Sequence, residues 1–354
     1  MPISISKYFD IDIGIQVGQW YLMGMLAIDK QLTPALESLA TLNKAAADPL
    51  RLQVLQLLEH NSFGVLELAD IFSISQSRLS HHLKILLSAG FVTTRREGNS
   101  IFYRRALLEN QDDGLDLVRS SIFKVVDSQP LPLHYQHAVK AIYEERAAQS
   151  QAFFERHAGK FTEVQDLIAG YEHYAESVAE IMHSLALSPS LTAMEVGPGQ
   201  GGFLKPLADQ FNHVIALDNS PAMLDLAAAQ MDKHQYQHIN YRLGDPQQAV
   251  SQNIKTDFLA FNMVLHHIPS PSETLKASAQ LLNPQGYLLI TDLCPHDQGW
   301  VKESCGDLWL GLEADDIKQW AQDAGLEHKQ QVIIGMRNGF QIQIQLFQQP
   351  LNKV

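Results

Sequence analysis

The sequence predicts two domains of different class: an α+β domain of helices and a β-hairpin, then an α/β domain whose parallel sheet ends in an antiparallel hairpin. Three observations predict this. The 354 residues exceed the length of an average single domain. Helical patterns precede two short strands between residues 33 and 108. From Leu191 onward strands and helices alternate, the order typical of a parallel sheet wrapped by helices.

Charge is unevenly distributed along the chain. The whole chain carries 26 Lys+Arg and 39 Asp+Glu, a formal net charge of −13. Residues 33–108 nevertheless hold eight basic and six acidic residues, whereas residues 109–354 hold sixteen and thirty. The acidic total therefore does not exclude nucleic acid as a partner of the N-terminal domain.

Cysteine content and hydropathy indicate the cellular compartment in which the protein is expected. Two cysteines, Cys294 and Cys305, cannot form a disulfide framework and suit a reducing, cytoplasmic location. No run of eighteen apolar residues indicates a membrane span. Residues 1–32 are expected to be an N-terminal extension rather than a signal peptide, because no basic segment precedes the apolar stretch Ile13–Ile28. This extension lies upstream of the natural start if that start is Met23 or Met25.

Residues 33–108 predict a winged helix-turn-helix. Each of the first two helices starts at a good N-cap followed by proline in the first turn. A tight turn at residues 73–75 joins the next two, and a hairpin turn at residues 97–99 joins two strands. In order, the segments are the helices beginning at Thr33 and Asp48, the helices Val65–Phe72 and Gln76–Ala89, and the strands Phe91–Arg96 and Ser100–Arg105.

The helix Gln76–Ala89 has one apolar and one polar face. Leu79, Leu83 and Leu86 form the apolar stripe that packs against other helices. The polar residues gather in the N-terminal half, which is the half that enters a major groove. The alternative is an ordinary solvated surface. The candidate DNA-binding residues are Gln76, Ser77, Arg78, Ser80, His81 and Lys84 on the helix and Arg95, Arg96 and Arg104 on the hairpin.

Residues 33–108 resemble the ArsR-type winged-helix repressors. The matching segments are Leu68–Phe72, Ser75–Lys84, Leu87–Val92, Arg95–Gly98 and Phe102–Arg104. The resemblance implies a homodimer, built from the helices Thr33–Ala47 and Leu115–Val126, on a palindromic double-stranded DNA operator. It does not bring metal sensing, because Val65–Phe72 holds no cysteine and no histidine lies between His82 and His134.

Residues 109–187 are expected to be mostly helical and to serve as a dimerisation region, a linker and a cap. The pattern is broken at Pro130 and Pro132. Aromatic residues recur on these helices, and they either close a ligand cleft or simply pack on the sheet. They are Phe153, Phe154, Phe161, Tyr171 and Tyr174.

The segment Met194–Phe203 follows a predicted strand and opens a helix. Glycines are needed where the backbone turns sharply and a ligand comes close. Asp218 ends the next strand, where a carboxylate can accept both ribose hydroxyls. Gly197, Gly199 and Gly202 also fit a GxGxxG spacing, so an NAD-type fold stays the competing interpretation.

Residues 188–350 resemble the class I S-adenosylmethionine (SAM) methyltransferases. Glu195 stands two residues before the first glycine, Asp245 closes the third strand, and Val332–Ile334 and Gln341–Phe347 form a terminal hairpin. The resemblance implies a Rossmann-like fold that binds SAM or S-adenosylhomocysteine (SAH). Glu195 and the glycines would hold the methionine moiety, Asp218 the ribose and Asp245 the adenine. The candidate cofactor-binding residues are Glu195, Gly197, Gly199, Gly201, Asp218, Asn219, Asp245 and Asn262.

No catalytic residue is assigned from the sequence, because methyl transfer from a sulfonium is an in-line displacement for which positioning can suffice. Candidates near the sulfur end, each equally compatible with a structural role, are His266, His267, Asp292, Cys294 and His296. No metal is expected, because the pairs His134/His137 and His234/His238 lack a third ligand in a convincing pattern.

The fused order resembles the SahR-type bacterial regulators of homocysteine recycling. Late segments carry this likeness, namely His296–Gln298, Trp300-Val301 and Cys305–Gly311. The resemblance implies a repressor whose operator affinity changes with SAM or SAH. An active small-molecule methyltransferase with an autoregulatory DNA-binding domain is the alternative, and an NAD-type redox sensor is the third hypothesis.

Overall fold

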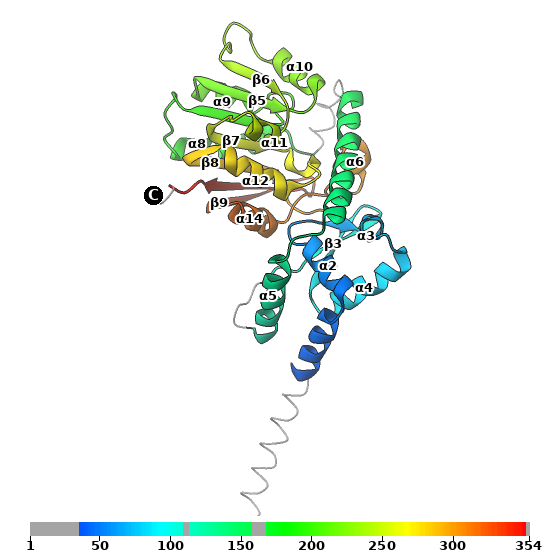
Figure 1. Ribbon diagram of the computed structural model, residues 1–354. Coiled ribbons are helices and arrows are strands. Elements are labelled where there is room, and N and C mark those ends of the chain that lie inside the picture. Colours follow the sequence, from blue (N-terminus) through cyan, green and yellow to red (C-terminus); the bar gives the residue numbers. More distant parts are fainter. Residues whose placement is uncertain (1–34, 109–112, 158–167, 352–354) are drawn as a thin grey trace, which may run out of the picture. The chain divides into compact units, whose positions relative to one another are not determined.

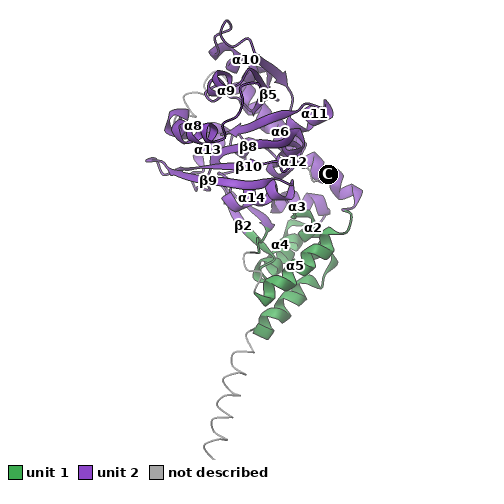
Figure 2. Ribbon diagram, turned by 90° about the vertical axis from the view of Figure 1, so that its left-hand side faces the viewer, with its two compact units in different colours: residues 1–59, 75–93, 105–130 green, residues 60–74, 94–104, 131–354 purple. Residues whose placement is uncertain are grey.

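The computed structural model describes residues 35–108, 113–157 and 168–351 (Figure 1). The chain divides into two compact units (Figure 2). The first comprises residues 1–59, 75–93 and 105–130, and the second residues 60–74, 94–104 and 131–354. The expected extension 1–32, the N-cap Thr33 and Phe161 lie outside the described residues. The domain limits expected at residues 108 and 187 stay predictions.

The first unit is helical. It holds a helical segment over residues 35–46, α2 (Pro49–Leu57), α4 (Gln76–Ser88) and α5 (Gly114–Asp127). Asp48 caps α2 by accepting a hydrogen bond from the Arg51 backbone N–H at 3.1 Å, and Pro49 takes the first helical position. The core consists of buried side chains that include Leu42, Leu55, Leu79, Leu83, Leu86, Phe91 and Phe123. The helices predicted for this region are confirmed.

The hairpin predicted as a wing is also confirmed. Strands β2 (Val92–Glu97) and β3 (Ser100–Arg105) meet at Gly98, whose φ of +63° lies in the left-handed region. A two-residue strand, β1 (Phe63–Gly64), pairs antiparallel with β3 and precedes α3 (Val65–Phe72). Two residues are too few to leave a periodic pattern, so β1 was not predicted.

A seven-stranded sheet forms the centre of the second unit, in the order β6-β5-β4-β7-β8-β10-β9. The first five strands in this order run parallel, and β10 pairs antiparallel with both β8 and β9. This confirms the predicted Rossmann-like fold with a terminal hairpin. The strands are β4 (Thr192–Val196), β5 (His213–Asp218), β6 (Ile239–Leu243), β7 (Thr256–Asn262), β8 (Leu282–Leu293), β9 (Glu327–Gly335) and β10 (Gln341–Gln348).

Helices cover both faces of this sheet. Successive strand residues feed opposite faces: Phe258 belongs to one hydrophobic cluster and Leu259 to the other. The first cluster contains residues of α8 (Ala175–Ser184), α9 (Leu204–Gln210), α10 (Pro221–Gln230) and α13 (Trp300–Cys305). The second contains residues of α11 (Pro246–Ser251), α12 (Pro271–Leu281) and α14 (Ala314–Asp323).

The alternating strand β10 buries two of its glutamines, whereas Gln341 at its start is exposed. Gln343 and Gln345 are fully buried. Gln343 donates from Nε2 to the Leu312 carbonyl at 2.6 Å, and Gln345 donates to the Ala314 carbonyl at 3.0 Å. Residues 312–314 therefore lie on this face of β10 and accept hydrogen bonds from both side-chain amides. None of the described helices is long and apolar enough for a membrane span.

Candidate functional site

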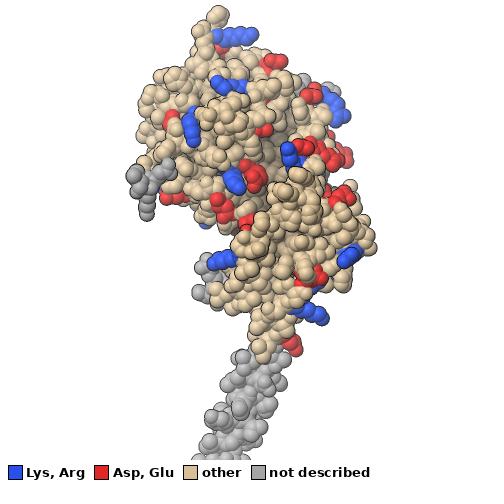
Figure 3. Space-filling model, viewed as in Figure 1, with Lys and Arg blue, Asp and Glu red and all other residues tan. Residues whose placement is uncertain are grey.

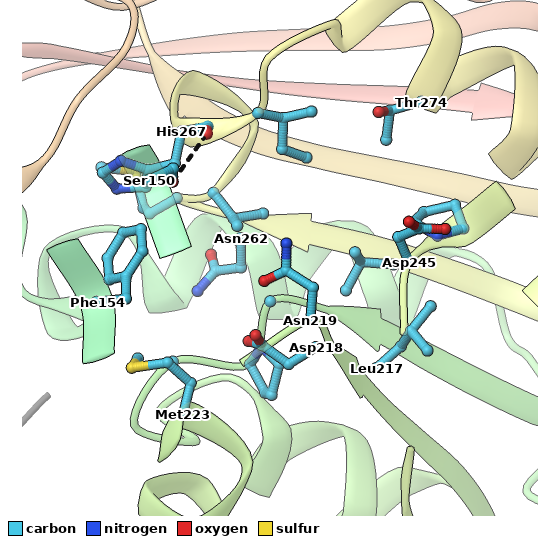
Figure 4. Close-up of a pocket in the computed structure, with 18 of the residues that line it drawn as sticks. Ser150, Phe154, Leu217, Asp218, Asn219, Met223, Asp245, Asn262, His267 and Thr274 are labelled. Carbon is cyan, nitrogen blue, oxygen red and sulfur yellow. Dashed lines mark hydrogen bonds between the residues drawn. The ribbon is translucent and has the colours of Figure 1, made fainter. Parts of the chain in front are cut away.

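A cavity of about 600 Å³ opens at the carboxyl ends of β4, β5 and β7 (Figure 4). This is the edge at which open parallel sheets bind their ligands. Backbone of three loops lines it, namely residues 196–200, 217–219 and 262–264. The sheet thus brings together segments that are widely separated in the sequence.

The glycine loop has the backbone conformation that its sequence predicts. Gly197, Gly199 and Gly201 have φ of +68°, +54° and +80°, a region that L side chains rarely adopt. A Cβ on Gly197 would lie 2.3 Å from Cγ2 of Val264. Gly197 and Gly199 line the cavity and Gly201 does not. The loop therefore requires glycine both for its turn and for the space beside β7.

Asp218 presents a carboxylate to the cavity at the end of β5 (Figure 4). Its Oδ1 accepts a hydrogen bond from the Ser220 backbone N–H at 2.8 Å, which fixes the side chain. Burial raises the pKa of Asp218 to about 6, although N–H groups of Ser220 and Asn219 oppose the shift. Asn219 lines the cavity beside it. A pair of vicinal hydroxyls is a suitable donor set for this carboxylate.

Glu195 is buried near the end of β4, with 1% of its surface exposed. It does not line the cavity, and its Oε2 has no hydrogen-bond partner among the described residues. Burial raises the pKa of Glu195 well above its ordinary value, and the charge of Asp218 adds to the shift. A buried acceptor without a donor favours a cationic or N–H donor group from outside the chain.

The remaining candidates line the cavity on either side of these carboxylates. Asp245 follows β6 and caps α11, because its Oδ1 accepts from the Gln248 backbone N–H at 2.7 Å. Its second carboxylate oxygen is not used by this cap. Asn262 ends β7 and faces the cavity near Asn219 in Figure 4. Polar side chains therefore lie along the cavity from Asp245, after β6, to Asn262, at the end of β7.

One face of α6 (Leu133–His157) closes the cavity, and of its lining residues only Phe154 was named from the sequence, as an aromatic that either closes a ligand cleft or packs on the sheet. Its lining residues recur at helical spacing: Lys140, Tyr143, Glu144, Ala147, Ser150 and Phe154. Tyr171 and Tyr174 complete this wall, so three of the five singled-out aromatics contact the cleft. Burial raises the pKa of Tyr171 to about 12, with a further contribution from the charge of Glu195.

Three of the residues named as catalytic candidates meet beside the cavity. The rings of His266 and His267 lie 4.1 Å apart, and His266 Nδ1 lies 2.6 Å from Oδ1 of Asp292. Burial opposes charging of His266, but the carboxylates of Asp292 and Asp307 outweigh it and raise its pKa to about 9. Of these residues only His267 lines the cavity. Burial raises the pKa of the Cys294 thiol to about 11, which argues against a nucleophilic role.

The predicted DNA-reading helix α4 presents its polar face to solvent. Leu79, Leu83 and Leu86 are buried, as expected. Ser80 is half-buried, and the other candidate residues of the helix are exposed: Gln76, Ser77, Arg78, His81 and Lys84. The amphipathic pattern therefore corresponds to the real faces of the helix.

The wing arginines are in three different situations. Arg96 is exposed. Arg95 pairs with Glu97 at 2.8 Å and donates from Nη2 to the Leu310 carbonyl at 2.6 Å. Arg104 pairs with Asp316 of α14. Two of the three wing arginines that were predicted to contact DNA are thus bonded to residues 310–316 of the second unit. The sequence did not indicate this role.

Residues 48–94 match the model of the bacterial regulatory protein, arsR family. The arsenical resistance operon repressor of Staphylococcus xylosus is 36% identical over 87 residues, covering 24% of this chain and 84% of that repressor. The chain belongs to the ArsR family of bacterial regulatory proteins. Residues 171–331 of this ArsR-family chain match a methyltransferase domain model, so a DNA-binding regulator is fused to a methyltransferase domain.

Two further similarities fall in the second part of this ArsR-family protein. A hybrid PKS-NRPS synthetase of Thermothelomyces thermophilus is 27% identical over 172 residues, covering 46% of this chain and 4% of the synthetase. Magnesium protoporphyrin IX methyltransferase from Synechocystis PCC 6803, solved with bound SAH, is 19% identical, with a TM-score of 0.48. That comparison covers 58% of this chain and 99% of the solved chain.

Proposed function

We propose that this ArsR-family chain is a transcriptional repressor whose operator affinity is set by SAM or SAH bound in the cavity. The observation that carries the proposal is the position of α6. This helix lines the cavity and also holds the segment that precedes the DNA-reading helix. A ligand that contacts α6 therefore acts on an element that the DNA-binding module shares.

The chemistry of the cavity favours an adenosyl ligand. Asp218 supplies an acceptor for ribose hydroxyls, and the glycine loop leaves room for a close backbone approach. Glu195 lies in β4 just before this loop and behind the residues that line the cavity, and its unpartnered Oε2 would accept from the ammonium group of the methionine or homocysteine moiety. Asp245 keeps one carboxylate oxygen for the adenine edge. These roles were expected from the sequence and remain proposals.

Arg146 links α6 to the helix-turn-helix. Its guanidinium donates to both carboxylate oxygens of Glu67 in α3, at 2.8 and 2.6 Å, and to the Ser62 carbonyl at 3.2 Å. Tyr143 and Ser150, about one turn away on either side, line the cavity. Paired, largely buried charges in this geometry hold two elements together tightly. A shift of α6 on ligand binding would therefore move α3.

The wing supplies a second link. Arg95, Glu97 and Arg104 are bonded to the segment 310–316, and the Trp309 backbone N–H of the same loop donates to the His266 carbonyl at 3.1 Å. Arginines held in this way are not free to contact phosphate. The conformation that contains the cavity is also the one in which the wing arginines are bonded to residues 310–316. A ligand that stabilises this conformation therefore lowers operator affinity. We infer that the adenosyl ligand acts as an inducer.

The remaining features follow the family resemblance. A homodimer on a palindromic operator is supported by large apolar side chains that the first unit leaves exposed, namely Leu36, Leu117 and Val125. Basic side chains lie scattered among acidic ones on the face shown in Figure 3, so DNA affinity would depend on α4 and Arg96 locally. The proposed setting is the cytoplasm, without a membrane partner.

A second candidate is an active small-molecule methyltransferase with an autoregulatory DNA-binding domain. The match of residues 171–331 to a methyltransferase domain favours it. Incubation of the purified chain with methyl-labelled SAM and cell extract separates the two functions. Labelled product formed at many turnovers per chain supports the enzyme, whereas a sensor binds SAM without releasing product.

The proposed function is tested by titrating SAM, SAH and NADH into the full chain bound to operator DNA, read by mobility shift. We expect at least one adenosyl compound to release DNA, with at least a fivefold change in apparent affinity, and NADH to have no effect. Asp218→Ala should retain basal DNA binding and lose the response. Release by NADH alone, or no response to either adenosyl compound, would overturn the proposal.

A further inference from the structure

A histidine-carboxylate cluster lies behind the cavity wall. Nε2 of His266 and Nδ1 of His267 lie 3.8 and 3.7 Å from Oδ1 of Asp307, and Nδ1 of His267 also lies 3.2 Å from the Gly306 carbonyl oxygen, a contact that metal ligation would replace. All three residues are buried, and they form the one group of potential metal ligands found among the described residues. The histidines follow β7, whereas Asp307 follows α13 forty residues later. Only the fold brings these ligand atoms together.

Asp307 is the unusual member of this cluster. Its side chain has no solvent exposure, and neither carboxylate oxygen has a hydrogen-bond partner among the described residues. The charged groups that act on it are His266, Asp292, Lys302 and Glu97. Lys302 is occupied elsewhere, since its Nζ donates to the Leu308 carbonyl and lies 3.6 Å from Glu97. A buried carboxylate left in this way needs a cation close to it.

His266 is oriented as a ligand. Its Nδ1 donates to Asp292, whose two oxygens also accept from the backbone N–H groups of Leu265 and Leu293 at 2.8 and 2.7 Å. This contact leaves Nε2 as the atom that faces Asp307. A carboxylate that fixes the far nitrogen of a ligating histidine is the usual outer shell of a zinc site. The imidazole of His266 thus lies between the carboxylates of Asp292 and Asp307.

We propose that His266 Nε2, His267 Nδ1 and Asp307 bind a divalent metal ion of the zinc class. With bonds of about 2.0–2.2 Å in a tetrahedral arrangement, ligand atoms lie roughly 3.3–3.5 Å apart. Each histidine nitrogen therefore needs to approach Oδ1 of Asp307 by only a few tenths of an ångström, and all three ligand atoms lie within 4.8 Å of one another. The fourth position is left for water. The site departs from the absence of metal expected from the sequence and does not depend on the proposed function.

The position of the site indicates what the metal would do. Asp307 stands three residues before Leu310, whose backbone N–H donates to Glu97 of the wing. His267 lines the cavity and contacts the ring of Phe154 edge-on at 4.9 Å. A metal ion would therefore fix the loop 306–311 to the cavity wall. Its expected role is structural, with three protein ligands that order this loop.

The test uses the full-length protein after removal of metal with EDTA and dialysis. We expect calorimetry with ZnCl₂ to give about one equivalent bound per chain, and CoCl₂ to give visible absorption typical of a tetrahedral site. Zinc should also raise the thermal unfolding temperature of the unsubstituted chain, a readout that requires no variant. Absence of stoichiometric binding, or binding without this shift, would overturn the proposal.

Substitutions of the proposed ligand residues test where the ion binds. Asp307→Asn and His266→Gln should each weaken zinc binding more than tenfold, and Asp292→Asn about 10- to 100-fold through the orientation of His266. The doubly substituted chain His134→Gln/His137→Gln, which removes two exposed histidines of α6, is the matched control and should bind zinc unchanged. Equal zinc affinity in Asp307→Asn and the unsubstituted chain would show that the bound ion lies elsewhere and contradict the assignment.

Discussion

The backbone N–H of Leu310 donates a hydrogen bond of 2.7 Å to the carboxylate of Glu97, so the wing glutamate accepts from the methyltransferase-like part. Glu97 is 2% exposed, and Arg95 lies 2.8 Å from its other oxygen. The wing of an ArsR-family module is thereby bonded to the loop that leads back to the cavity wall. In the proposed function, this contact is part of the route between ligand and operator, and four predictions follow from the site and its connections.

Release of Arg104 should favour DNA binding. In Asp316→Asn the buried partner of this arginine loses its charge, so the arrangement with the engaged wing becomes less stable. We expect tighter operator binding in the presence of saturating SAH, by about fivefold or more, which corresponds to about 1 kcal/mol. Fluorescence anisotropy with labelled operator measures the change.

Asp315→Asn is the matched control for Asp316→Asn. It removes the same charge one residue away from an exposed position of α14. Operator affinity in this variant should stay within twofold of the unsubstituted chain. Equal effects in both variants would mean that net charge, and not the bond to Arg104, determines the affinity.

Binding of SAH should depend on pH through Asp218. In the proposed function, ribose hydroxyls donate to the ionised carboxylate of Asp218, whose pKa burial raises to about 6. Protonation therefore competes with the ligand below that pH, and Kd should rise toward tenfold per pH unit as pH falls from 6 to 5. Calorimetry between pH 5 and 8 measures this slope.

In Asp218→Asn the same series should give a weak and nearly constant Kd. The sign for stability is opposite to that of an ordinary ion-paired carboxylate. Because the folded pKa lies above the ordinary aspartate value of 3.8, this group makes the chain less stable as pH rises from about 4 to 6. A Kd for the unsubstituted chain that does not vary with pH would contradict the role given to Asp218.

Alanine at Gly197 should impair folding as well as ligand binding. The left-handed φ costs about 1–2 kcal/mol for an L residue, and the contact with Val264 adds about 1–3 kcal/mol. Chemical denaturation of Gly197→Ala should therefore show a loss of about 2–5 kcal/mol. Gly325→Ala separates the two causes, since Gly325 has φ of +88° but open space around its Cβ position. An equal loss in both variants would show that the Val264 contact carries no cost.

Arg78 on the exposed face of α4 should contact the operator. Arg78→Ala is expected to weaken binding by about 1–3 kcal/mol, roughly 5- to 150-fold, and to reduce the salt dependence if the contact is to phosphate. Lys233→Ala removes an exposed charge of the second unit and should leave operator affinity unchanged. Similar losses in the two variants would indicate non-specific electrostatic binding.

Local patterns predicted the elements on which the fold depends. The N-cap pair Asp48-Pro49, the left-handed glycines of the loop after β4 and the alternation of β10 each report a local conformation, and each is observed. The carboxylate of Asp218 was also predictable, because the end of a parallel strand places it at the ligand-binding edge. All of these features depend on residues that are close together in the sequence.

Long-range partners could not be predicted in the same way. The wing arginines have the same sequence context whether they contact phosphate or, as Arg104 does, Asp316 over two hundred residues later. Ala147 and Ser150 line the cavity on a helix whose pattern shows no distinct apolar stripe. Asp307 is unusual because it is buried without hydrogen-bond donors among the described residues, and no pattern in the sequence predicts that burial.

The central claim is a coupling between the cavity and the operator, and coupling is reciprocal. The most direct measurement is calorimetry of SAH into the full-length protein, first alone and then with saturating operator DNA. We predict measurable binding to the free protein and a Kd at least fivefold weaker on DNA. Identical affinities in the two titrations, or no heat from SAH or SAM in either, would contradict the account.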